Sequence, residues 1–179
     1  MSQLPDTPSS PSGPTPDAAP PSAVPSVPAT PAEVSPALRV RTGDWATLGP
    51  AASVVRQRVF VEEQGVPAEL ELDEADALCV HALAEDDGGV IGTGRLLPAE
   101  AGVAKVGRMA VLPRWRGRGI GAALLRALTE AAVARGDREL RLHAQLSARG
   151  FYERAGYAVE GEVFVEAGID HIEMARRLG

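Results

Sequence analysis

Arginine and glycine alternate in one short segment of this 179-residue chain, at positions 114–122, where the sequence is Arg-Trp-Arg-Gly-Arg-Gly-Ile-Gly-Ala. The segment follows a strand-like stretch and opens a helical one, so backbone N–H groups and the positive end of the helix dipole converge on it. Its three arginines add charge-assisted contacts that suit pyrophosphate oxygens. The segment therefore predicts a binding site for a phosphorylated ligand.

Three phosphate-binding motifs differ in what they require at this position. A Walker loop needs a lysine after its last glycine, and the chain's one lysine, Lys105, lies elsewhere. The dinucleotide fingerprint G-x-G-x-x-G/A matches residues 117–122, but its acidic partner should end the next strand, whereas Glu139 begins it. The third motif, R-x-x-G-x-G, is complete at Arg116, Gly119 and Gly121.

In its surroundings, this third motif resembles the coenzyme A-binding turn of the GNAT N-acyltransferase superfamily. The preceding Gly-Arg-Met-Ala-Val-Leu-Pro at 107–113 and the later Phe-Tyr-Glu-Arg-Ala-Gly-Tyr at 151–157 follow the order found in that superfamily. Three further segments, at 59–64, 71–76 and 166–171, resemble its ElaA-type branch. The resemblance covers residues 38–179 of the chain.

The resemblance implies an α+β fold in which a mostly antiparallel central sheet of about seven strands is flanked by helices. Acetyl-CoA would lie in the gap between two splayed strands, with its thioester carbonyl at backbone N–H groups that stabilise developing negative charge. No metal is implied. The expected cofactor contacts are Met109, Ala110, Val111, Arg116, Gly117, Arg118, Gly119, Ile120, Gly121 and Ala122.

Tyr152 follows Phe151 in a short helix predicted over residues 147–155. The resemblance implies that Tyr152 is the general acid that protonates the departing coenzyme A thiolate. A packing role is the alternative, because Ala148, Phe151, Tyr152 and Ala155 have the spacing of an apolar helical stripe.

An amine acceptor must lose a proton before it attacks, because a primary ammonium has a pKa of about 10.4. Glu62 and Glu63, at the end of the first predicted helix, are candidate bases, since the resemblance puts the acceptor side there. The other acceptor-side candidates are Arg108, Glu71, Asp73, His81, His143 and His171. A chain of water molecules could serve instead.

Residues 69–76 carry five carboxylates in eight positions. Such charge runs are usually solvated loops; alternatively, the segment flanks the acceptor and favours a cationic amine. Arg108 could anchor an acceptor carboxylate or phosphate or pair with an acid of this segment, and the ion pair is favoured. Arg-x-x-Val-Phe at 56–60 followed by E-x-D-x-x-D also resembles acyl-homoserine-lactone synthases, which typically lack the intact R-x-x-G-x-G motif found here.

Composition divides the chain into two parts. Residues 1–37 hold 11 of the 15 prolines and no lysine or arginine, so they are expected to form a disordered Pro/Ser/Thr/Ala-rich tail, and 38–179 to form the acetyltransferase domain. A single cysteine excludes an internal disulfide, and no apolar run reaches the ~20 residues of a membrane span. The chain is therefore expected to be cytoplasmic and not to bind a membrane. Its net charge of −6 argues against nucleic-acid binding. A homodimer is a further expectation.

Apolar periodicity predicts the element order βα(α)βββαβαββ within residues 38–179. A first helix should begin at Gly49-Pro50 and end near Gly65, and a second should run from the glycine-rich turn to Gly136. Strands are expected at 38–41, 80–84, 90–97, 103–111, 140–142, 157–164 and 169–177.

These features predict an N-acetyltransferase that moves an acetyl group from acetyl-CoA to a primary amine by direct attack in a ternary complex. A small metabolite is the preferred acceptor. The alternative is a non-catalytic acyl-CoA-binding sensor or interaction module with the same fold.

Overall fold

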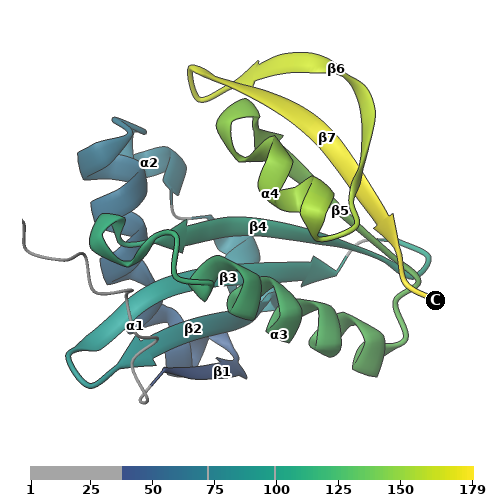
Figure 1. Ribbon diagram of the computed structural model, residues 1–179. Coiled ribbons are helices and arrows are strands. Elements are labelled where there is room, and N and C mark those ends of the chain that lie inside the picture. Colours follow the sequence, from purple (N-terminus) through teal and green to yellow (C-terminus); the bar gives the residue numbers. More distant parts are fainter. Residues whose placement is uncertain (1–37, 72, 99) are drawn as a thin grey trace, which may run out of the picture. The chain divides into compact units, whose positions relative to one another are not determined.

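Seven strands form one mixed sheet in the computed structural model, which describes residues 38–71, 73–98 and 100–179 (Figure 1). The predicted tail at 1–37 lies outside the described residues. The strand order is β1-β2-β3-β4-β5-β7-β6, and β4 and β5 form the parallel pair in an otherwise antiparallel sheet. The predicted mostly antiparallel sheet is confirmed. The strands are β1 Arg39–Gly43, β2 Val80–Asp86, β3 Gly89–Pro98, β4 Val103–Val111, β5 Glu139–Gln145, β6 Ala158–Glu166 and β7 Ile169–Arg177.

The first helix begins earlier than the sequence predicted. Helix α1 spans Trp45–Arg56 because Asp44 caps it by accepting a hydrogen bond from the Thr47 backbone N–H. Pro50 therefore lies inside α1 instead of at its start. A π-helix, Gln57–Glu63, continues from α1 toward the site described below. The remaining α-helices are α2 Ala68–Glu71, α3 Ile120–Arg135 and α4 Arg149–Arg154.

Helices α1 and α3 cover opposite faces of the sheet (Figure 1). Side chains alternate between the faces along β2, so Ala82 and Ala84 join the core under α3 while Leu83 packs against α1. The apolar stripe of α3, including Leu124 and Leu128, is fully buried against the sheet. The helices thus pack on both faces of the central strands, and the site lies where these strands separate.

The central strands β4 and β5 separate soon after they meet. They pair at Val103↔Glu139, Ala104↔Leu140 and Lys105↔Arg141, and no pair follows, although both strands continue. Strand β4 stays paired with β3, and β5 with β7, so the two halves of the sheet diverge. The splay that the resemblance implies is therefore present.

A bulge in β4 lies beside this divergence. The β3–β4 register shifts between Thr93↔Ala110 and Arg95↔Gly107, which leaves an extra residue on β4. Arg108, within the bulge, has a φ of 51°, a backbone conformation uncommon for a residue other than glycine. None of the helices in the described part of the chain is both long and apolar enough to cross a membrane.

Candidate active site

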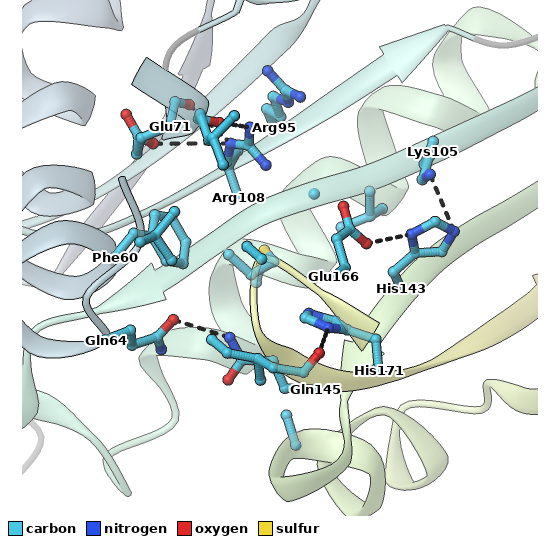
Figure 2. A pocket seen from close by; sticks show the side chains of 18 of the residues that line it. Phe60, Gln64, Glu71, Arg95, Lys105, Arg108, His143, Gln145, Glu166 and His171 are labelled. Atoms are coloured by element: carbon cyan, nitrogen blue, oxygen red, sulfur yellow. Dashed lines mark hydrogen bonds and ion pairs between the residues drawn. The ribbon is translucent and has the colours of Figure 1, made fainter. Parts of the chain in front are cut away.

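A cavity of about 500 Å³ opens where β4 and β5 diverge (Figure 2). Its wall comes from the π-helix and the loop after it, α2, β3, both diverging strands, α4 and the turn between β6 and β7. Gln145 at the end of β5 donates a hydrogen bond of 3.0 Å to Gln64, which joins the two sides of the cavity. The predicted site residues that line it are Glu71, Arg108, Met109, His143, Tyr152 and His171.

One end of the cavity holds a chain of three polar side chains. His143 Nδ1 lies 2.8 Å from Glu166 Oε2, and Lys105 Nζ lies 3.2 Å from His143 Nε2. A lysine ammonium can only donate, so Nε2 accepts and Nδ1 carries the proton that is donated to Glu166. Burial opposes the charge of Glu166, but the hydrogen bond from His143 and the nearby cations hold the pKa of that carboxyl below its usual value.

Phe164 fixes the two histidines at this end. Its ring meets that of His143 edge-on, with centroids 4.8 Å apart, and stacks on His171 at 6.0 Å. His171 Nδ1 lies 2.8 Å from the Ile169 carbonyl oxygen, to which it donates. Sequence reasoning missed Glu166 and Lys105 as site residues, although Glu166 lay in a segment quoted for the family resemblance.

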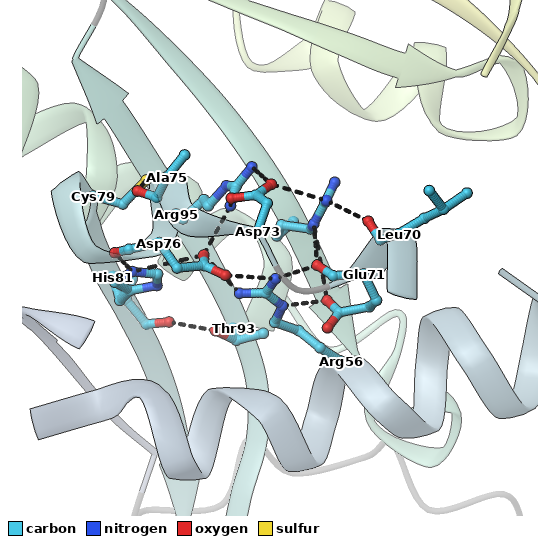
Figure 3. Close-up of polar contacts among 12 residues, drawn as sticks. Arg56, Leu70, Glu71, Asp73, Ala75, Asp76, Cys79, His81, Thr93 and Arg95 are labelled. Atoms are coloured by element: carbon cyan, nitrogen blue, oxygen red, sulfur yellow. Dashed lines mark hydrogen bonds and ion pairs between the residues drawn. The ribbon is translucent and has the colours of Figure 1, made fainter. Parts of the chain in front are cut away.

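The other end of the cavity borders a buried ion cluster, which we call the arginine–acid cluster (Figure 3). At its centre, Arg56 is 1% exposed. It pairs with Glu71 through Nε and donates to Asp76 at 2.9 and 3.1 Å and to the Glu71 carbonyl oxygen at 2.6 Å. Arg95 donates to Asp73 and Asp76, each at 2.8 Å. The cluster comprises Arg56, Arg95, Arg108, Glu71, Asp73 and Asp76.

The acidic segment is solvated only in part, because Glu69, Asp73 and Glu74 are exposed whereas Glu71 and Asp76 are buried. Glu71 and Asp76 are 5% and 2% exposed, and three arginines balance the three clustered carboxylates. Burial would raise the pKa of Asp76, but hydrogen bonds from Arg56 and Arg95 lower it, and a hydrogen bond from Arg95 lowers that of Asp73. The carboxylates of Glu71, Asp73 and Asp76 are thus matched by arginines, and Glu69 and Glu74 are the exposed acids of the segment outside the cluster.

Arg108 makes the ion pair that the sequence favoured. Its Nη2 lies 3.3 Å from Asp73 Oδ2 and donates to the Leu70 carbonyl oxygen at 3.0 Å, while Nε donates to the Glu71 carbonyl oxygen at 3.1 Å. Arg108 nonetheless lines the cavity, so pairing and exposure to the acceptor side occur together. Figure 2 shows Arg108 and Glu71 on one side of the cavity and His143 and Glu166 on the other.

His81 is not part of the cavity. It is 1% exposed, its Nε2 lies 2.9 Å from the Asp76 carbonyl oxygen, and its ring packs 4.9 Å from that of Trp45. Burial lowers its pKa, which keeps it neutral. His81 thus supports the fold beneath the arginine–acid cluster instead of facing an acceptor.

Asp76, Cys79 and His81 bring potential metal ligands within 4.8 Å of one another. Both Asp76 carboxylate oxygens already accept hydrogen bonds from arginines, and the Cys79 thiol donates to the Ala75 carbonyl oxygen. Burial raises the pKa of Cys79 to about 11, so it is a thiol at neutral pH and a poor ligand or nucleophile. The absence of a metal remains a prediction.

The two glutamates predicted as bases lie outside the cavity lining. Glu62 is exposed. Glu63 accepts two hydrogen bonds of 2.7 Å from Arg116, which lower the pKa of its carboxyl. Arg116 in turn donates from Nε to the Val111 carbonyl oxygen at 2.9 Å. Glu63 therefore ties the π-helix to the end of β4 and to the glycine-rich turn.

The glycine-rich turn ends at the first residue of α3. Gly117 and Gly119 have φ values of 74° and 79°, and a Cβ at either would face open space. Gly119 caps α3 without a side-chain hydrogen bond, and the first turn has no acidic residue, so its N–H groups are available to an anion. Two arginine guanidiniums lie over the Trp115 ring, that of Arg114 at 5.2 Å and that of Arg118 at 5.0 Å.

The predicted strand contacts occupy the C-terminal half of β4. Met109 lines the cavity, Ala110 is buried and Val111 is half-buried. Beyond Lys105, the edge of β4 that faces β5 has no strand partner in the described sheet. This edge runs from the cavity to the glycine-rich turn, so an extended ligand with a pyrophosphate at α3 would pass along it.

Tyr152 belongs both to the core and to the cavity. It is 8% exposed, contacts the rings of Phe151 and Tyr157 edge-on at 4.8 and 5.8 Å, and lines the cavity wall. Burial raises its pKa to about 12, so the phenol stays protonated across the physiological range. The packing and catalytic interpretations of Tyr152 are therefore compatible with each other.

Comparison with known proteins agrees with this geometry. The family model described as "Acetyltransferase (GNAT) domain" matches residues 50–178. The uncharacterized N-acetyltransferase YjcF of Bacillus subtilis is 39% identical over 126 residues, which are 70% of this chain and 89% of YjcF.

Two solved structures share the fold. The Escherichia coli ElaA structure aligns with a TM-score of 0.70 and 26% identity, over 78% of this chain and 99% of ElaA. A GNAT family acetyltransferase from Elizabethkingia anophelis with acetyl-CoA bound aligns with a TM-score of 0.63 and 19% identity, over 80% of this chain and all of that one, and shows the fold alone. With the family model matching most of its length, the chain belongs to the GNAT acetyltransferase family.

Proposed function

We propose that the protein transfers the acetyl group of acetyl-CoA to a primary amine of a small molecule, by direct attack in a ternary complex. The observation that carries this proposal is the meeting of Tyr152 and the His143–Glu166 pair in one cavity at the divergence of β4 and β5. Family membership supports the choice of acetyl-CoA as the donor. The cavity then receives the acceptor.

The cofactor would lie along the unpaired edge of β4. Its pyrophosphate would meet the N-terminal N–H groups of α3, where no acidic side chain competes. Arg114 and Arg118 remain beside the turn, whereas Arg116 is engaged by Glu63. The backbone at 109–111 would offer N–H groups to the thioester carbonyl oxygen, as the resemblance implied.

His143 is the base that this proposal assigns. Glu166 accepts the Nδ1 proton, which leaves Nε2 as the acceptor facing Lys105. The contact of Lys105 Nζ with Nε2 supports this assignment, because an acceptor ammonium could donate to the same nitrogen once the lysine side chain moves aside. His143 then removes one proton, and the neutral amine attacks the thioester carbon.

Tyr152 would act on the leaving group. As the C–S bond breaks, the thiolate accepts a hydrogen bond and then a proton from the phenol, and the tyrosinate regains a proton from the nitrogen of the tetrahedral adduct, which becomes the amide. In water this transfer is uphill, because a thiol with a pKa of about 8.5 is a stronger acid than a phenol with a pKa of about 10. Inside the cavity, burial disfavours the thiolate as well as the phenolate. It therefore raises the pKa of both the thiol and the phenol, so burial of the phenol alone does not set the gap between the two values.

The test is release of free coenzyme A thiol from acetyl-CoA across a panel of primary amines, with the amide product identified by mass spectrometry. His143→Gln should lower kcat by about 10²–10⁴-fold, the usual contribution of a general base. Glu166→Gln should lower it less, because the imidazole remains while its orientation is lost. Calorimetric binding of acetyl-CoA with no thiol release from any amine would instead favour the sensor function.

A separate prediction concerns Glu63. Because Glu63 holds Arg116 through two hydrogen bonds of 2.7 Å, Glu63→Gln should raise KM for acetyl-CoA about twofold to fivefold and leave kcat nearly unchanged. The exposed neighbour provides the control, since Glu62→Gln should change neither constant. A large fall in kcat for Glu63→Gln would mean that Glu63 takes part in the chemistry.

A further inference from the structure

We propose that the acceptor is an amino carboxylate, whose carboxylate binds Arg108 at one end of the cavity while its amine meets His143 at the other. This inference rests on the proposed function, which supplies the amine. It is carried by the unused hydrogen-bonding capacity of Arg108, by its backbone conformation and by the arrangement of charges along the cavity.

The guanidinium of Arg108 has one nitrogen that the cluster does not engage. A guanidinium offers five N–H donors, two of them on each Nη. In Arg108, Nε donates to the Glu71 carbonyl oxygen, and Nη2 donates to the Leu70 carbonyl oxygen and to Asp73. Nη1 has no acceptor among residues 38–71, 73–98 and 100–179. Both of its N–H groups are thus open to a ligand oxygen.

The other two arginines of the cluster differ from Arg108 in this respect. Every nitrogen of Arg56 donates within the cluster, and both Nη groups of Arg95 are held by Asp73 and Asp76. The side chains of Arg56 and Arg95 are 1% and 11% exposed, compared with 26% for Arg108. Arg95 also lines the cavity, but both of its Nη groups are engaged, so Arg108 is the member of the cluster with an Nη group left for a ligand.

The surroundings of Arg108 favour an added anion. Burial and then the neighbouring charges of Arg95 and Arg56 lower the pKa of Arg108, while the carboxylates of Asp73 and Glu71 act in the opposite direction. The φ of 51° at Arg108 is also costly for a side chain with a Cβ, and such strain is typical of residues held in place for a ligand. A carboxylate oxygen at Nη1 would accept hydrogen bonds from the N–H groups that no described residue engages.

The spacing of the two ends sets the kind of molecule that fits. Arg108 is three residues beyond Lys105 on β4, and a regular strand rises about 3.3 Å per residue, so with the bulge at Arg108 the two positions are separated by at most about 10 Å along the strand. Arg108 and the His143–Lys105 pair reach into the same cavity from these ends (Figure 2). An α-amino carboxylate group alone is too short to reach both, so a spacer of several carbons should bind best.

The experiment compares ω-amino carboxylates of increasing length with n-alkylamines of the same carbon number. The parent enzyme should show a higher kcat/KM for the carboxylates at the favoured length. Arg108→Gln should lower kcat/KM for the carboxylates at least about 10-fold more than kcat/KM for the alkylamines, as expected for loss of a charge-assisted hydrogen bond to the carboxylate. Arg108→Lys should restore part of the preference. An equal loss on both series, or no preference in the parent enzyme, would overturn the proposal.

Two further measurements keep this test independent of folding and of turnover. If Arg108→Gln does not fold, n-alkanoates should still inhibit the parent enzyme competitively against an alkylamine, and n-alkanols of equal length should not; equal inhibition by both overturns the proposal. Calorimetric binding of an ω-amino carboxylate to the coenzyme A complex needs no catalysis. Binding that Arg108→Gln abolishes, without turnover of any amine, would support the anion site and reject the proposed function.

Discussion

Replacing Tyr152 with phenylalanine is expected to lower kcat by about 10²–10⁴-fold, the range of general acid catalysis, with little change in KM for acetyl-CoA. Without the phenol, the thiolate must depart inside a buried cavity with no hydrogen bond and no proton from residue 152. The ring packing against Phe151 and Tyr157 is preserved in the variant, so the fold should be retained. Steady-state kinetics by thiol release, with a thermal melt of each variant, measures the effect.

Tyr157 provides a matched control for this substitution. It is a neighbouring buried tyrosine whose hydroxyl has no hydrogen-bond partner in the described residues, and it does not line the cavity. Tyr157→Phe removes the same atom from a similar environment and should leave kcat unchanged. If both variants lose activity equally, the loss reflects packing of the tyrosine pair, and Tyr152 is not the acid.

The largest expected effect on stability comes from Arg56. Arg56→Gln leaves Glu71 and Asp76 buried without their shared cation, and breaking a buried ion pair by removing one partner typically costs about 3–5 kcal/mol. That cost is a large fraction of the about 5–15 kcal/mol by which a folded domain is typically stable. Chemical denaturation followed by circular dichroism should therefore show a much lower midpoint for this variant.

An exposed ion pair of the same type is the control for Arg56. Arg41 pairs with Glu85 across β1 and β2 at 2.9 and 3.0 Å, on the surface. Arg41→Gln should leave the midpoint within error of the parent, because exposed pairs gain little over solvation by water. Equal midpoints for Arg56→Gln and the parent protein would show that the cluster relaxes by admitting water.

Much of the fold followed from local patterns. The glycine-rich turn, the apolar stripe of α3 and the alternation along β2 depend on residues close in sequence, and each predicts its element directly. The start of α1 did not follow, because Gly49-Pro50 is a strong local signal, whereas the Asp44 cap is a single side chain. Local sequence does not decide which of these two signals marks the start of the helix.

The candidate site was harder to predict because its contacts join distant segments. His143 and Glu166 are 23 residues apart and Arg56 and Asp76 are 20 apart, so no spacing rule links them. Two features of the sequence could have indicated the arginine–acid cluster. Arg56 lies within the apolar stripe of α1, and Arg95 lies within the apolar strand β3. Glu62 and Glu63 were proposed from their place at a helix end, but their side chains are directed by partners that this place does not reveal.

The short β4–β5 ladder also links cofactor supply to folding. The strands β1–β4 and β5–β7 share three backbone pairs at this junction. In the proposed function, amide groups of the cofactor would occupy positions that a neighbouring strand fills elsewhere in the sheet. A ligand that binds the native state alone stabilises it by about 2.7 kcal/mol at a hundred times its Kd. The lifetime of the folded protein would then rise and fall with the concentration of acetyl-CoA around it.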